Sequence, residues 1–112
     1  MIGVTIGIDL GTSGCRALAV DASGAVLVES RRPLPEPLTP ADGWVEQDPR
    51  LWWEAVVGVL TETVARLRGA RVRALCVDGT SASLLLAAPD GEPLTPALLY
   101  SDRRALEAAS RV

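Results

Sequence analysis

The order of apolar and polar positions divides the chain into short strands and one long helix. Alternating or β-branched apolar runs predict strands over residues 4–9, 15–20 and 25–32. The connections between them, Gly11–Gly14 and Asp21–Gly24, consist of turn-forming residues. Because short turns join neighbouring antiparallel strands, we expect a three-stranded antiparallel meander.

A proline-rich segment and a long helix follow this meander. Four prolines in residues 33–40 exclude a helix or a central strand, so an extended surface connection is expected. Asp48 and Pro49 are typical of a helix start, with an N-cap acceptor followed by proline. The helix is predicted to reach about Arg68, where Gly69 fits the position that ends it. Its apolar face follows the 3.6-residue period at Leu51, Trp52, Ala55, Val56, Val59, Leu60, Val64 and Leu67.

The last third of the chain predicts further strands and the start of another helix. Strands are expected over residues 72–77 and 83–88, with a short extended piece at 97–100. Residues 72–77 are nearly all apolar, as in a strand inside a sheet. Residues 102–112 read as the opening of an amphipathic helix without a stop signal. The order βββ-α-β-β-α predicts an α/β fold, with the meander and a crossover helix in one mixed sheet.

Composition narrows the chemistry. The 112 residues correspond to one domain at most, and 48% hydrophobic with 22% charged residues is typical of a globular chain. The net charge of −3 argues against nucleic acid as a partner. The sequence contains no His and no Lys, which excludes an imidazole base, a His-ligated metal and a P-loop lysine within these residues.

The cysteines and the N-terminus indicate the compartment. Cys15 and Cys76 each lie in an apolar run, which favours inert core thiols in a reduced, intracellular protein; a disulfide or a reactive thiol is the alternative. No basic segment followed by an apolar stretch opens the chain, so a signal peptide is not expected. No apolar run approaches the ~20 residues of a membrane span. We therefore expect a cytoplasmic protein with no membrane partner.

Two turns share one combination of residues. They read Asp9-Leu10-Gly11-Thr12-Ser13 and Asp78-Gly79-Thr80-Ser81. Glycine lets the backbone approach a phosphate, hydroxyl groups add donors, and aspartate is a hard oxygen ligand for Mg²⁺. Arg16 follows the first turn and could reach the same phosphates. Because these residue types also form ordinary tight turns, that interpretation stays open for both segments.

Three spaced motifs resemble the FGGY family of carbohydrate kinases. They are residues 6–21 (IGIDLGTSGCRALAVD), residues 43–53 (GWVEQDPRLWW), and residues 77–81 (VDGTS) with 96–105 (PALLYSDRRA). Together they cover nearly all of the chain. The resemblance implies a ribonuclease H-like fold of the actin and hexokinase ATPase superfamily. It also implies phosphorylation of a sugar or polyol hydroxyl, with ATP and Mg²⁺ as cofactors.

The resemblance also implies roles for individual residues. Asp9 would bind the metal at the γ-phosphate and, with Thr12, form the catalytic residues of this chain. Gly11, Thr12, Ser13 and Arg16 would hold the ATP phosphates. Asp78, Gly79, Thr80, Ser81 and Asp102 would contact the sugar.

The second turn bears on the substrate. Asp78-Gly79-Thr80-Ser81 differs from the Asn-Gln-Arg-Glu of glycerol kinases and from the Gly-Gln-Met-His of typical xylulokinases. It is closer to the ribulokinase-like branch. The resemblance therefore disfavours glycerol and favours a ketopentose such as D-ribulose or D-xylulose.

Two expected parts of such a kinase are not matched. In the family the catalytic base is an Asp beyond the matched region, and the nucleotide-binding C-terminal domain is separate. We expect residues 1–112 to be part of an N-terminal domain, inactive alone, with the sugar, ATP and the rest of the kinase as partners. Apolar cut edges predict self-association of the chain. The alternatives are a stand-alone, non-catalytic binding or interaction module and a heat-shock-chaperone-type ATPase, which shares only residues 8–12.

Several large side chains have two interpretations. Trp44 could stack on a sugar, whereas Trp52 and Trp53 fit helix packing. Tyr100 is expected to pack in the core or against another domain. The arginines at 103–104 fit a solvated helix start, or polar groups turned toward the sugar.

Overall fold

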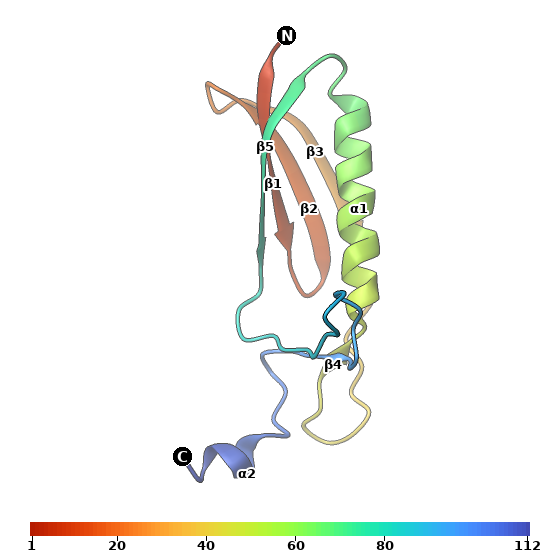
Figure 1. Ribbon diagram of the computed structural model, residues 1–112, viewed down its shortest axis with the longest axis vertical. Coiled ribbons are helices and arrows are strands. Elements are labelled where there is room, and N and C mark those ends of the chain that lie inside the picture. The colour runs from red at the N-terminus through yellow and green to blue at the C-terminus, as the bar shows by residue number, and fades with distance from the viewer. The chain divides into compact units, whose positions relative to one another are not determined.

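The computed structural model describes all 112 residues, which form two compact units. The first unit contains residues 1–35 and 51–79, and the second contains residues 36–50 and 80–112. The elements in chain order are β1 (Gly3–Leu10), β2 (Gly14–Asp21), β3 (Val26–Pro33), β4 (Glu46–Gln47), α1 (Pro49–Arg66), β5 (Arg71–Gly79), β6 (Ala97–Leu98) and α2 (Leu106–Ala109) (Figure 1). Neither helix has the length and hydropathy of a membrane span.

A four-stranded mixed sheet forms the first unit, in the order β3-β2-β1-β5. β2 is antiparallel to both β1 and β3, which confirms the predicted meander. β5 lies parallel to β1, and α1 is the connection that brings the chain back (Figure 1). Parallel neighbours require such a crossover, so the predicted mixed α/β sheet is confirmed.

The core lies between α1 and one face of the sheet. Alternate residues of β1 are buried, namely Val4, Ile6 and Ile8, and they share one apolar cluster with Ala55 and Val59 of α1. This alternation follows from the two-residue period of a strand. The intervening residues of β1, which include Asp9, therefore lie on the opposite face of the sheet.

Most of the apolar face predicted for the helix is confirmed, but two predicted packing residues are exposed. Trp52 packs against the core, but Trp53 is 71% exposed, and Val64 is also exposed. Thr63 is the buried residue of the last turns instead. The reason is geometric: residue 53 is rotated about 100° from residue 52 on a helix of 3.6 residues per turn. α1 begins at Pro49 and ends at Arg66.

β5 is an edge strand, contrary to the expectation of a strand inside a sheet. All nine of its residues are exposed, including the apolar Val72, Leu75 and Val77. β5 pairs with β1 on one side, and the buried cluster contains no residue of β5. Both cysteines are free thiols, and Cys15 is buried as predicted. Cys76 is exposed, so the prediction of a core position is wrong for Cys76.

The second unit contains little regular structure. β4 pairs with β6, and residues 83–88 make isolated bridges at Leu84 and Ala87 instead of the predicted strand. No continuous strand forms because the two ends of this segment pair with different partners, Leu84 with Leu98 and Ala87 with Pro93. The last helix is also shorter than predicted: α2 begins at Leu106, because the Asp102 side chain accepts the Arg104 amide and holds a turn there.

Candidate functional site

The turn at Gly11–Gly14 joins β1 to β2 and is fixed on two sides. The Gly11 amide donates to the Gly14 carbonyl at 2.9 Å, and the Leu34 amide donates to the Ser13 carbonyl at 2.9 Å. A Cβ on Gly14 would lie 3.0 Å from the backbone oxygen of Arg32, so the close approach of β3 requires glycine there. The predicted turn is confirmed, and the end of β3 lies against it.

Four charged residues form a row across the sheet beside this turn. Asp9 on β1 pairs with Arg16 on β2 and with Asp78 on β5, and Arg16 pairs with Arg31 on β3. Residues directly opposite one another in a sheet extend their side chains to the same face. The row therefore lies on the face opposite α1, and it joins predicted site residues from both Asp-Gly turns.

The charges in this row interact across short distances while remaining open to solvent. Asp9 Oδ2 lies 3.9 Å from Arg16 Nη2, and the two side chains are 57% and 46% exposed. A hydrogen bond with Asp9, desolvation and the negative charge of Asp9 raise the pKa of Asp78, while Arg16 acts in the opposite direction. Two adjacent carboxylates of this kind provide the oxygen atoms that bind hard cations.

Two cavities open beside these residues within the first unit. The larger, about 430 Å³, is lined by the turn and by the end of β3. The smaller, about 290 Å³, is lined by the strands that carry the two aspartates. Asp9 and Arg16 contribute to both. The predicted site residues Asp9, Arg16 and Asp78 are thus accessible to a ligand.

The structure distributes the predicted sugar-contact residues over both units. Asp78 and Gly79 end β5 in the first unit, whereas Thr80, Ser81 and Asp102 belong to the second. Thr80 and Ser81 are exposed. Their roles at a sugar stay predictions.

Asp102 has an extensive set of partners inside the second unit. Its carboxylate accepts hydrogen bonds from the Val45 amide at 2.8 Å and from the Arg104 guanidinium at 2.8–3.0 Å. Hydrogen bonds from Arg104, followed by that of Val45, lower the pKa of Asp102 to about 2, against the opposing effect of desolvation. Arg104 also donates to Glu46 at 2.9 Å and lies 3.9 Å from the centre of the Trp44 ring.

This network was not expected from the sequence. Arg104 contacts Glu46, Asp102 and the Trp44 ring, so the prediction of a solvated helix start is wrong for Arg104. Arg103 is exposed. Tyr100 is 62% exposed, which excludes core packing within this chain. The contact between Glu46 and Arg104 could not be predicted from their spacing in the sequence, because it depends on the pairing of β4 with β6.

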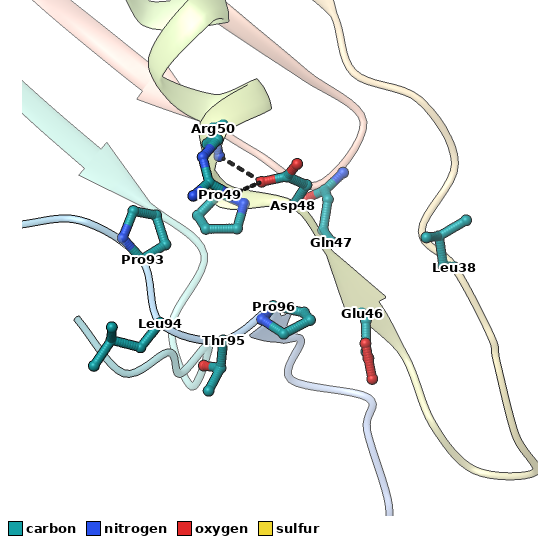
Figure 2. Close-up of a pocket in the computed structure, with 10 residues that line it drawn as sticks. All are labelled: Leu38, Glu46, Gln47, Asp48, Pro49, Arg50, Pro93, Leu94, Thr95 and Pro96. Carbon is teal, nitrogen blue, oxygen red and sulfur yellow. Dashed lines mark hydrogen bonds and ion pairs between the residues drawn. The ribbon is translucent and has the colours of Figure 1, made fainter. Parts of the chain in front are cut away.

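A further cavity of about 360 Å³ lies in the second unit (Figure 2). Asp48 accepts the Arg50 amide at 2.9 Å and pairs with its guanidinium at 3.9 Å on one wall. Leu38, Pro93 and Leu94 provide apolar surface around it. None of its lining residues is a predicted site residue.

Known protein structures share the fold of this chain. The crystal structure of xylulose kinase from Rhodospirillum rubrum superposes with a TM-score of 0.87 at 30% identity, covering 97% of this chain and 23% of that one. The predicted ribonuclease H-like fold of the actin and hexokinase ATPase superfamily is confirmed. Residues 4–112 match the N-terminal domain of the FGGY family of carbohydrate kinases, and the chain belongs to that family.

Curated relatives carry two different names. A glycerol kinase from Gloeobacter violaceus is 38% identical over 103 residues, covering 91% of this chain and 20% of the relative. A xylulose kinase from Klebsiella pneumoniae is 35% identical over 111 residues, covering 91% of this chain and 21% of the relative. The chain spans about a fifth of the length of these relatives. Since the identities are similar, the comparison gives no preference between glycerol and a ketopentose.

Proposed function

We propose that the polypeptide containing this chain transfers a phosphoryl group from ATP to a hydroxyl group of a sugar or polyol. In this proposal the chain supplies the phosphate turn. The observation that supports it most is the shared cavity of the Gly11–Gly14 turn with Asp9 and Arg16. Membership of a carbohydrate kinase family gives the class of reaction.

Each residue around that cavity has a role that its chemistry suits. The exposed Ser13 hydroxyl and the turn amides other than that of Gly11, which donates to Gly14, would donate hydrogen bonds to phosphate oxygens. Arg16 would bind the same oxygens, since its planar guanidinium matches a phosphate. Thr12, half-buried in the turn, would orient the transferred group. This positioning and charge stabilisation is most of what phosphoryl transfer requires from a protein.

The residues present also fit a magnesium ion. Mg²⁺ is usually held by one or two carboxylates together with substrate phosphates and water. Asp9 offers an exposed carboxylate at the turn, with Asp78 beside it, and no cluster of three protein ligands exists. When bound with ATP, the ion would neutralise charge on the phosphates. Asp9 would hold it and Arg16 would balance the remaining charge.

For the acceptor we propose a ketopentose such as D-ribulose or D-xylulose. The Asp-Gly-Thr-Ser sequence at residues 78–81 supports this choice. Glycerol is the competing acceptor, because relatives named glycerol kinase match at 38% identity. Asp102, Thr80 and Ser81 would contribute to acceptor contacts. The base that takes the hydroxyl proton is not assigned within residues 1–112.

The test is ADP release by the full-length polypeptide with D-ribulose, D-xylulose and glycerol. Asp9→Asn should lower turnover by about 100-fold or more, because it removes a charged group at the reacting phosphate. Asp42→Asn, in an exposed loop, is the matched control and should retain activity. An Asp9→Asn variant that keeps most of the activity contradicts the assignment, and so does wild-type protein that phosphorylates none of the three acceptors.

A second candidate is a non-catalytic binding or interaction module. The assay of the full-length polypeptide with the three acceptors distinguishes the two, since ADP formation there contradicts a non-catalytic module. A cytoplasmic location is likewise a proposal, which rests on composition and the two free cysteines.

A further inference from the structure

Two arginines stand directly opposite each other on adjacent strands beside the phosphate turn. Arg16 of β2 is in register with Arg31 of β3, so both side chains extend from the same face of the sheet. Like charges in this arrangement destabilise a sheet. Violations of a local rule of this kind tend to occur at functional sites. An anion bound between the two guanidinium groups would attract both and offset the repulsion between them.

The surroundings of Arg31 suit such an anion. Arg31 and Arg16 line the same cavity of about 430 Å³ as Gly11, Ser13 and Gly14. The hydrogen bond from Leu34 to Ser13 holds the end of β3 against the turn. The position of Arg31 relative to the turn is therefore set by backbone contacts, which is what a binding residue requires.

The present partner of Arg31 is weakly held. Its guanidinium pairs with Glu29 on the same strand, and the Arg31 side chain is 69% exposed. Exposed ion pairs contribute little free energy, so a more highly charged ligand can replace the carboxylate. Glu29 is thus a competitor for Arg31 rather than a fixed anchor.

We propose that Arg31 is a second cationic contact for the polyphosphate group of the nucleotide. This inference rests on the proposed function, in which ATP phosphates bind at the turn. Adjacent strands lie ~4.8 Å apart, so Arg16 and Arg31 present their guanidinium groups to neighbouring phosphates of one chain. Arg16 lies nearest Asp9, and Arg31 extends the site away from that carboxylate.

A more distant arginine of the same sheet provides a matched control. Arg73 on β5 is exposed and follows Val72, which pairs with Val4 at the opposite end of β1 from the turn. Arg73 lines neither of the cavities near the turn. Arg31→Gln and Arg73→Gln therefore remove the same charge from one sheet, the first inside the cavity of the proposed anion and the second away from it.

The experiment measures ATP affinity of the full-length polypeptide by calorimetry, together with the KM values for ATP and for the sugar. Arg31→Gln should weaken ATP binding about tenfold, the effect of one hydrogen bond to a charged group. The KM for the sugar should not change. Arg31→Lys should recover part of the affinity, and Glu29→Gln should tighten binding by removing the competitor. Arg73→Gln should leave ATP affinity unchanged.

The outcomes separate this inference from the proposed function. If the wild-type protein phosphorylates a sugar and Arg31→Gln binds ATP as tightly as wild type, the inference is wrong and the kinase activity stands. Equal losses from Arg31→Gln and Arg73→Gln also overturn it, because they indicate a general effect on the sheet. A wild-type protein that binds no ATP removes the basis of both proposals.

Discussion

Two hydroxyl groups meet in the core, where α1 packs against β3. Thr63 Oγ1 donates to Ser30 Oγ at 3.0 Å, and the two residues are 0% and 2% exposed. Replacing Thr63 by Val keeps the shape of the side chain and removes the donor. We expect Thr63→Val to lower the free energy of unfolding by about 1–3 kcal/mol, the cost of leaving a buried polar group without its partner.

A double-mutant cycle isolates this contact. Ser30→Ala alone should cost a similar free energy, but the double variant should be less destabilised than the sum of the two by about 1 kcal/mol, since no orphaned hydroxyl remains. Urea unfolding followed by circular dichroism gives the four values. Thr61→Val, on the exposed side of the same helix, is the control and should change stability by less than about 0.5 kcal/mol. Strictly additive losses refute the argument, because they show that the two hydroxyl groups do not depend on each other.

Three further predictions follow from exposure and charge. Cys76 should react with a thiol reagent much faster than Cys15, because Cys15 is buried and burial, with the nearby Asp9 charge, raises its pKa; equal rates contradict the structure. The pKa of Asp102 is depressed, so its stabilising contact with Arg104 should be complete above the ordinary carboxyl pKa and lost as pH falls through about 2. Fluorescence of the tryptophan beside Arg104 should follow that titration, and Asp102→Asn should abolish it. Leu75→Lys on the open edge of β5 should reduce self-association of the 112-residue chain in light scattering; a wild-type chain that is monomeric at high concentration contradicts this expectation.

The local signals in the sequence were sufficient for the meander, the crossover helix and the Gly11–Gly14 turn. Each depends on residues close together in the chain: the glycines at 11 and 14, and the Asp48-Pro49 start of α1. They were insufficient for residues 83–88. The apolar residues there predicted a strand, but a strand needs one partner along its length, and this segment pairs with Leu98 at Leu84 and with Pro93 at Ala87.

Contacts between distant segments were the least predictable part of the site. The register of β3 on β2 places Arg31 opposite Arg16, and the pairing of β4 with β6 brings Glu46 to Arg104. A shift of one residue in either pairing would turn these side chains to the other face. No single segment contains that information.

The sequence by itself determined the family, the order of the main elements and the residue types at the Gly11–Gly14 turn. These follow from local periodicity, turn chemistry and motif spacing. The tertiary structure decided which charges act together: Asp9 with Asp78 and Arg16 on one face, and Asp102 with Arg104 in the second unit. It also decided that β5 is an exposed edge, although its sequence is apolar. The physical reason is that burial and charge pairing depend on which strands become neighbours, and that choice is made only when the sheet closes against α1.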